Sequence, residues 1–229
     1  MKPKLIIITG AGISAESGIK TFRDSNGLWK QYRFEEVASP EAWEKHPDVV
    51  LEFYNQRRKQ LFEVEPNEAH KALVKLENKF DVKIITQNVD DLHERAGSSN
   101  VIHLHGELKK ARSTVDPALI YELKDWELKI GDLCEKGSQL RPDIVWFGEP
   151  VPMMHDAIKF VKEADFLLVI GTSLAVYPAA GLVNHAKKVI PKYYIDPKAH
   201  KIPKVKNLKI INEKATIGVP ALVSGLLSE

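Results

Sequence analysis

The sequence predicts an α/β fold in which a doubly wound parallel sheet carries a smaller inserted helical lobe. Three observations predict it: short β-branched runs recur along the chain, segments with helical periodicity separate them, and the first run leads straight into a glycine-rich turn. Strands that alternate with helices are typical of parallel sheets with helices on both faces. Because such sheets bind ligands at the carboxyl ends of their strands, we expect functional residues just after the predicted strands.

The predicted strands are continuous apolar runs, as in strands buried on both faces of a parallel sheet. The first covers residues 5–9 and stops at Gly10. The same composition returns at residues 82–86, 166–170, 193–195 and 208–211, and a weaker strand pattern covers residues 101–104. Helical periodicity is clearest at residues 68–79 and 154–163, between these runs.

Two stretches interrupt the alternation of strands and helices. Residues 22–66 are rich in aromatic side chains and look helical and irregular, whereas residues 108–142 carry charges and turn residues but no clear strand. We expect both to leave the sheet and return, so that residues 1–229 form one unit with a cleft for a large substrate between two lobes. The predicted large lobe comprises residues 1–25, 81–107 and 143–229, and the small lobe comprises the insertions 26–80 and 108–142.

The bulk composition argues against several classes of protein. Apolar residues make up 44% of the chain and charged residues 28%, which is an ordinary globular balance. The net charge is only +2 and the lysines of residues 187–214 are interpreted as a solvated face, so we expect no nucleic-acid partner. No apolar run is long enough for a membrane span, and Cys134 is the only cysteine. We therefore expect a cytoplasmic protein with no membrane partner and no intrachain disulfide.

The turn after the first strand contains Gly10, Gly12 and Gly18. Glycines at such a turn let a pyrophosphate approach main-chain N–H groups at the start of a helix. The spacing differs from the usual GxGxxG pattern, so the turn alone leaves two interpretations open: a dinucleotide site, or a tight strand-to-helix turn with no ligand.

Five groups of short motifs, in family order, resemble those of sirtuins. They are Gly10-Ala11-Gly12-Ile13-Ser14 with Thr21-Phe22-Arg23, Gln87-Asn88-Val89-Asp90, His103-Leu104-His105-Gly106, Val145-Trp146-Phe147-Gly148-Glu149, and Gly171-Thr172-Ser173 with Val176-Tyr177-Pro178-Ala179. The resemblance implies a Rossmann-like lobe that binds NAD and a smaller lobe, with an acylated lysine of a protein substrate between them. It implies NAD-dependent deacylation, with release of nicotinamide and 2'-O-acyl-ADP-ribose. A mono-ADP-ribosyltransferase, an NAD glycohydrolase, a plain deacetylase and a non-catalytic NAD sensor remain the alternatives on the same fold.

The resemblance also assigns roles to individual residues. The catalytic residues are His105, as general base, and Asn88; a histidine suits this role because its pKa lies near neutrality. His103 is the weaker candidate for the base. The implied cofactor-binding residues are Gly10, Ala11, Gly12, Ile13, Ser14, Phe22, Arg23, Gln87, Asn88, Asp90, Gly171, Thr172, Ser173, Asp196 and Thr216. The implied substrate-binding residues are Tyr54, Arg57, Val145, Phe147, Gly148, Glu149 and Val176.

Two of these assignments have alternatives that the residues alone leave open. Asn88 and Asp90 follow a predicted strand, where either residue could simply cap the next helix. Residues 147–149 resemble the family's strand that pairs with the substrate backbone, and an ordinary edge strand is the alternative.

Tyr54 and Arg57 predict the acyl preference. They lie three residues apart on a probable helix, so both project from one face. Tyr-x-x-Arg at this point resembles the sirtuin subgroup that prefers succinyl, malonyl and similar acidic lysine modifications. A guanidinium binds a carboxylate through two parallel hydrogen bonds, and a tyrosine hydroxyl can donate another. A surface arginine beside a half-buried tyrosine is the simpler alternative.

The sequence departs from the family pattern at two places. Many sirtuins hold a structural zinc with four cysteines, but here Ser113 lies near the first expected cysteine and Cys134 is the only thiol, so we expect no zinc. Apolar packing must then stabilise residues 108–140, with Leu119, Tyr121, Leu123, Trp126, Leu128 and Leu133 as candidates. Asp196 stands where the family usually has asparagine beside the adenosine ribose, and we expect binding to survive this exchange.

Overall fold

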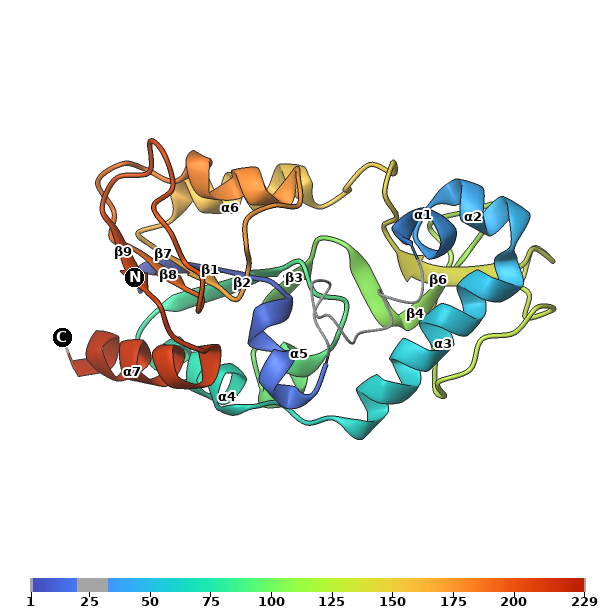
Figure 1. The fold of residues 1–229 in the computed structure, drawn as a ribbon, viewed down its shortest axis with the longest axis horizontal. Coiled ribbons are helices and arrows are strands. Elements are labelled where there is room, and N and C mark those ends of the chain that lie inside the picture. The colour runs from blue at the N-terminus through green and yellow to red at the C-terminus, as the bar shows by residue number, and fades with distance from the viewer. Residues whose placement is uncertain (1, 20–32, 229) are drawn as a thin grey trace.

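A computed structural model describes residues 2–19 and 33–228 of the chain. Figure 1 shows two parts: a parallel sheet with helices above and below it, and a smaller lobe at the other end of the molecule that contains helices and a second sheet. In the described part of the chain, no helix is both long and apolar enough to cross a membrane.

The large lobe is built on a six-stranded sheet with the order β3-β2-β1-β7-β8-β9. Every neighbouring pair of its strands is parallel. The strands are β1 (Lys4–Thr9), β2 (Asp81–Thr86), β3 (Val101–His103), β7 (Phe166–Ile170), β8 (Lys192–Ile195) and β9 (Leu208–Ile211). The predicted doubly wound parallel sheet is confirmed, and the boundaries of its strands differ from the prediction by one residue at most.

The two faces of the sheet bury alternate residues of the same strand. Leu5 and Ile7 of β1 pack in one core cluster with α4 (Glu68–Lys75) and α7 (Ala215–Ser228). Ile6 and Ile8 pack on the other face with α6 (Met154–Glu163) and the 3₁₀ helix η5 (Ala179–His185). All four β1 side chains are buried. This explains why the strand reads as a continuous apolar run, because both of its faces are covered.

The small lobe joins α1 (Phe34–Val37), α2 (Pro40–Lys45) and α3 (Pro47–Glu63) to an antiparallel sheet with the order β5-β4-β6. The strands are β4 (Gly106–Ser113), β5 (Ile120–Glu122) and β6 (Leu140–Ile144). The expectation of no strand in residues 108–142 was therefore wrong, and the lobe is mixed instead of purely helical. The β4–β6 pairing shifts register between Gly106 and Ala111, and this bulge breaks the alternation of buried and exposed residues that would have revealed β4.

One predicted boundary between the lobes is also wrong. Residues 66–80 were placed in the small lobe, but α4 and the following 3₁₀ helix η4 (Leu76–Asn78) pack on the large sheet. Asn67 ends the crossover from the small lobe: its side chain accepts a hydrogen bond from the Ala69 backbone N–H at 3.0 Å and so caps α4. The amphipathic face of α4 then covers β1 and β2 next to α7.

Buried polar groups, as well as apolar packing, hold residues 108–140 in place. The fully buried Arg58 on α3 donates to the backbone carbonyls of Leu108 and Trp126, while the Asn55 side chain exchanges two hydrogen bonds with the Leu128 backbone, of 2.9 and 3.0 Å. Leu128 is buried, and Leu119, Tyr121 and Leu123 pack against the same cluster, as expected. Leu133 was expected to pack there but is 55% exposed.

Candidate active site at the carboxyl ends of the strands

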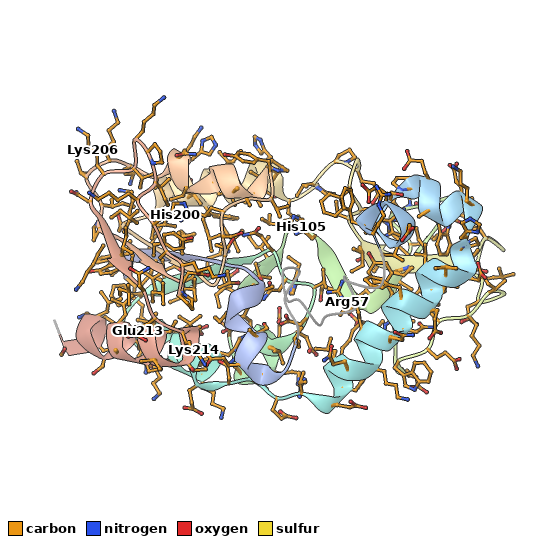
Figure 2. The ribbon with its side chains drawn as sticks, viewed as in Figure 1. Arg57, His105, His200, Lys206, Glu213 and Lys214 are labelled. Atoms are coloured by element: carbon orange, nitrogen blue, oxygen red, sulfur yellow. The ribbon has the colours of Figure 1, made fainter. Side chains whose placement is uncertain are left out.

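The polar residues predicted from the sequence gather at one edge of the large sheet. They follow β1, β2, β3, β7 and β8 at the carboxyl end of each strand, because all strands of a parallel sheet end on the same side. In Figure 2, His105 at this edge and Arg57 on α3 both lie in the middle of the molecule, between the sheet and the small lobe.

The glycines after β1 and β7 let two loops touch backbone to backbone. The Gly12 N–H donates to the Gly171 carbonyl at 2.8 Å, and a Cβ on Gly12 would lie 2.7 Å from Gly171 Cα. Gly171 has φ of +61°, and a Cβ there would lie 2.3 Å from the Ile13 nitrogen. No other residue type fits this contact. Ala11, Ile13 and Ser14 continue from it through η1 (Ala11–Ile13) and η2 (Ala15–Ser17).

Ser14, Asn88 and Asp90 form a buried polar triad behind the glycine loop. The Ser14 hydroxyl donates to Asp90 Oδ2 at 3.0 Å, and Asn88 Nδ2 donates to Ser14 Oγ at 3.2 Å and to the Gly10 carbonyl at 3.3 Å. Burial raises the pKa of Asp90, and its hydrogen bonds from Leu92 and Ser14 oppose that shift. Asp90 Oδ1 also accepts from the Leu92 N–H, at the start of α5 (Leu92–Ala96). The carboxyl group therefore helps to cap a helix and also reaches the glycine loop.

A backbone carbonyl holds the His105 ring in one tautomer. Its Nδ1 lies 3.0 Å from the Gln87 carbonyl oxygen, which can only accept, so Nδ1 carries the proton and Nε2 keeps its lone pair. Burial lowers the pKa of His105, so the ring is neutral near pH 7. Gln87 in turn donates from Nε2 to Thr172 Oγ1 at 3.2 Å, which links the loops after β2 and β7.

His103 lies nearby but is occupied by two other groups. Its Nδ1 is 3.0 Å from the Asn88 carbonyl and its Nε2 is 2.8 Å from Glu94 Oε1. Burial alone would lower the pKa of His103, but the Glu94 carboxylate outweighs it and raises the pKa above its ordinary value. With both nitrogens engaged, His103 has no lone pair for a substrate proton, which agrees with its ranking as the weaker candidate.

Tyr54 and Arg57 project from the same helix, α3, as their spacing predicts. Tyr54 is almost fully buried, and burial raises the pKa of its hydroxyl to about 12, so it stays protonated. Arg57 is half-buried, and its guanidinium lies 5.5 Å from the centre of the Phe53 ring. Burial lowers the pKa of Arg57, while the nearby Tyr54 and Asp90 raise it. Tyr54 and Asp90 are therefore near enough to Arg57 to favour its charged form.

The predicted peptide-binding strand is a turn. β6 ends at Ile144, and residues 147–149 form a turn with φ of +91° at Gly148. The Val145 N–H donates to the His105 carbonyl at 2.9 Å, and the Phe147 N–H donates to the Ala38 carbonyl at 3.0 Å, so this segment joins the two lobes. Glu149 accepts hydrogen bonds from Arg112, from Arg141 and from the Trp146 N–H, and these bonds stabilise the conformation of the turn.

The remaining predicted residues lie around this core of the site. Asp196 follows β8 and accepts from the Lys198 N–H at 2.8 Å. Thr216, at the start of α7, donates from its hydroxyl to Glu16 at 2.7 Å, so that hydroxyl is engaged within the protein. Ser173 is half-buried beside the buried Thr172, and Val176 is exposed. Phe22 and Arg23 lie outside the described residues.

The structure also shows residues that the motifs did not indicate. Asn67 donates to the Ile13 carbonyl at 2.8 Å and to Ser17 Oγ at 3.0 Å, and these bonds join the glycine loop to the start of α4. The Trp146 indole N–H donates to the Tyr54 hydroxyl at 3.1 Å. Neither contact has a local signal in the sequence, because the partners are 50 or more residues apart.

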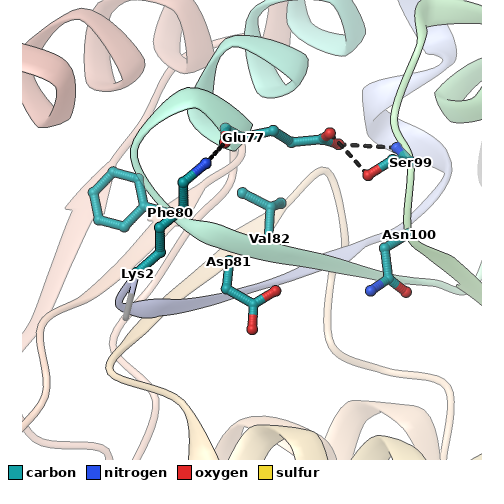
Figure 3. A pocket seen from close by; sticks show the side chains of 7 residues that line it. All are labelled: Lys2, Glu77, Phe80, Asp81, Val82, Ser99 and Asn100. Carbon is teal, nitrogen blue, oxygen red and sulfur yellow. Dashed lines mark hydrogen bonds between the residues drawn. The ribbon is translucent and has the colours of Figure 1, made fainter.

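A pocket of about 370 Å³ lies at the opposite, amino-terminal edge of the sheet. Figure 3 shows its lining and the contacts of Glu77 within it. Glu77 accepts from the Ser99 N–H and hydroxyl, and its carbonyl accepts from Lys2 at 2.6 Å. The pocket contains none of the predicted site residues, and three of its polar lining residues, Lys2, Glu77 and Ser99, bind one another.

In the described part of the chain, no group of three or more His, Cys, Asp or Glu side chains is arranged to hold a metal ion. Ser113, which lies near the first cysteine position of zinc-binding sirtuins, contacts Cys134 together with Ser138: the two hydroxyls lie 2.9 Å apart, and the thiol lies 3.4 and 3.2 Å from them. The hydrogen bond with Ser113, followed by that with Ser138, lowers the pKa of Cys134 to about 7. The absence of zinc stays a prediction.

The chain is similar to known proteins in both sequence and fold. The model of the Sir2 family matches residues 10–178. A Helicobacter pylori protein named NAD-dependent protein deacylase is 59% identical over 225 residues, which cover 97% of each chain. A solved mutant Sir2 homologue in complex with ADP-ribose superposes with a TM-score of 0.90 at 41% identity and covers 99% of this chain and 93% of its own. A Sir2 homologue in complex with NAD has a TM-score of 0.89 at 42% identity, covering 99% of this chain and 90% of its own.

Proposed function

The chain belongs to the Sir2 family, and from that premise we propose that it is an NAD-dependent protein deacylase that prefers succinyl- and malonyl-lysine to acetyl-lysine. The observation that supports the proposal is that Tyr54 and Arg57 lie on one helix, α3, and that Asp90 of the polar triad is near enough to raise the pKa of Arg57. The proposed substrates are therefore acylated lysine side chains of proteins.

The residues at the strand ends fit a dinucleotide. Gly10 and Gly12 leave no room for a side chain against the loop after β7, so the two backbones lie close together, and the Ser14–Asn88–Asp90 triad offers buried polar groups beside them. The residues proposed to hold NAD are the glycine loop 10–14, Phe22, Arg23, Gln87, Asn88, Asp90, Gly171, Thr172, Ser173, Asp196 and Thr216. NAD supplies the ribose that takes the acyl group when nicotinamide leaves.

His105 is the proposed general base and Asn88 the second catalytic residue. Nε2 of His105 is the atom that accepts the proton, because Nδ1 donates to the Gln87 carbonyl and fixes the tautomer. Asn88 is buried and its amide is oriented by Ser14 and the Gly10 carbonyl, so it can bind a ribose hydroxyl without reorganising.

The acyl group is proposed to lie against α3, while residues 145–149, which include the turn, and Val176 flank the lysine. Arg57 presents a planar cation to the terminal carboxylate of a succinyl or malonyl group, and Tyr54 presents a protonated hydroxyl. An acetyl group offers neither residue a carboxylate. Glu149 acts on this site through the turn that it stabilises, since Arg112 and Arg141 occupy its carboxylate.

The test compares acetyl-, malonyl- and succinyl-lysine versions of one peptide, with and without NAD, by mass spectrometry. We expect acyl-ADP-ribose and nicotinamide to form only with NAD, and the highest kcat/KM with the acidic groups. Equal kcat/KM for acetyl and succinyl peptides would refute the acyl preference. ADP-ribose attached to the peptide, with the acyl group retained, would show a mono-ADP-ribosyltransferase instead.

A further inference from the structure

Trp146 determines the direction in which the Tyr54 hydroxyl donates. An indole N–H has no lone pair and can only donate, so in the 3.1 Å contact the Tyr54 oxygen is the acceptor. The single hydroxyl hydrogen must then point away from Trp146. In residues 2–19 and 33–228, no acceptor is found for that hydrogen, although Tyr54 is only 1% exposed. The Tyr54 hydroxyl therefore has one buried O–H hydrogen to donate, and the contact with Trp146 determines its direction.

Trp146 is itself held in a fixed orientation. The centre of its ring lies 3.2 Å from the Arg141 guanidinium carbon and 5.8 Å from the Trp43 ring, so cation–π and aromatic contacts hold the indole. Glu149 accepts from the Trp146 backbone N–H at 2.8 Å and from two nitrogens of Arg141. The backbone, ring and N–H of Trp146 are thus all fixed by named contacts, and the side chain is 2% exposed.

We propose that Trp146 is a positioning residue for acyl specificity: its indole N–H fixes the Tyr54 hydroxyl as a donor to the acidic end of the acyl group. The inference rests on the proposed preference for succinyl-lysine. An oxygen that accepts one hydrogen bond is polarised and donates a second more strongly, by about 10–30%. A hydroxyl that is already oriented also loses no rotational freedom when the carboxylate binds.

The test is the ratio of desuccinylation to deacetylation, each measured as kcat/KM on one peptide. Trp146→Phe removes the N–H but keeps an aromatic ring between Arg141 and Trp43. We expect the ratio to fall about threefold to tenfold, the effect of one net hydrogen bond, through a higher KM for the succinyl peptide. Trp43→Phe is the matched control: it alters the packing on the same indole but keeps the Trp146 N–H that binds Tyr54, and the ratio should keep its wild-type value.

A double-mutant cycle separates positioning from packing. If Trp146 acts through Tyr54, Trp146→Phe should not lower the ratio further in a Tyr54→Phe background. An equal loss of both activities in Trp146→Phe, or the same loss of ratio with and without the Tyr54 hydroxyl, would overturn the inference. If the wild type shows no preference for succinyl- over acetyl-lysine, the proposed function and this inference both fail. If the wild type shows the preference but Trp146→Phe leaves the ratio of the two activities unchanged, the inference alone fails.

Discussion

Replacing Arg57 by methionine tests the proposed acyl preference most directly. Methionine keeps the length and much of the volume of the side chain but removes the guanidinium. Arg57 lies on α3, where the nearby Tyr54 and Asp90 raise its pKa, whereas the neighbouring Arg58 is buried in contacts within the small lobe. The substitution therefore removes a cation near the acyl site and leaves the contacts that hold the lobe together.

The expected magnitude follows from the burial of Arg57. Truncating one partner of a buried, hydrogen-bonded charge pair costs ~2–5 kcal/mol. Because Arg57 is only half-buried, solvent screens part of the interaction, and the lower part of the range applies, ~2–3 kcal/mol. This corresponds to a loss of about 30- to 150-fold in kcat/KM for the succinyl peptide. The acetyl peptide has no carboxylate to lose, so its kcat/KM should stay the same or rise.

The assay measures kcat/KM for succinyl- and acetyl-lysine versions of one peptide in wild type, Arg57→Met and Lys59→Met. Lys59 is an exposed cation on the same helix whose ammonium lies 5.2 Å from the centre of the Trp126 ring, so its replacement controls for the change in charge alone. A parallel collapse of both activities in Arg57→Met would assign the residue to structure, and an undiminished desuccinylation would refute the assignment outright.

Four further predictions concern the base, its titration, the metal and the fold. His105→Ala should lower kcat/KM by ~10²–10⁴, while calorimetry still detects NAD binding; near-normal turnover would reject His105 as the base. Because burial lowers the pKa of His105 below its ordinary 6.5, the base stays neutral further into acid, and the acid limb of kcat/KM should lie below pH 6.5; a limb centred above that value would contradict the assignment. Elemental analysis should find no stoichiometric zinc, and a chelator should leave Tm unchanged; one zinc per chain would disprove this. Arg58→Leu leaves the Leu108 and Trp126 carbonyls without their donor and should lower the free energy of unfolding by ~2–4 kcal/mol, which denaturant titration would measure; a loss no larger than that of Lys59→Leu would count against it.

The strands of the large sheet could be predicted because each is a contiguous apolar run. β7 (Phe166–Ile170) is buried along most of its length, so its sequence alone identifies it. β4 was not predicted, because its buried residues Leu108, Ala111 and Ser113 are separated by charged residues. A bulge in its pairing also breaks the regular alternation of buried and exposed positions. The local pattern of apolar residues therefore predicts a strand that is covered on both faces better than a bulged strand that is covered on one face.

The same division applies to the site. Gln87, Asn88, Asp90 and His105 directly follow strands, so the rule that ligands bind at strand ends is enough to place them together from the sequence alone. The turn at residues 147–149 could not be predicted, because its conformation depends on Arg112 and Arg141 converging on Glu149 from β4 and β6. An extended segment and a turn have similar local sequences here, and only the distant partners decide between them.

By itself, the sequence determined the succession of the large-sheet strands along the chain, the glycine loops and the identity of the groups at the strand ends, because these depend on residues that are neighbours in the chain. The tertiary structure alone decided which histidine keeps a free lone pair, since His105 and His103 differ only in their partners, Gln87 for one and Asn88 with Glu94 for the other. It also decided the direction of the Tyr54 hydroxyl, because its donor, Trp146, lies 92 residues away. Protonation and hydrogen-bond direction are set by what folding brings within about 3 Å of an atom, and no local pattern in the chain records that.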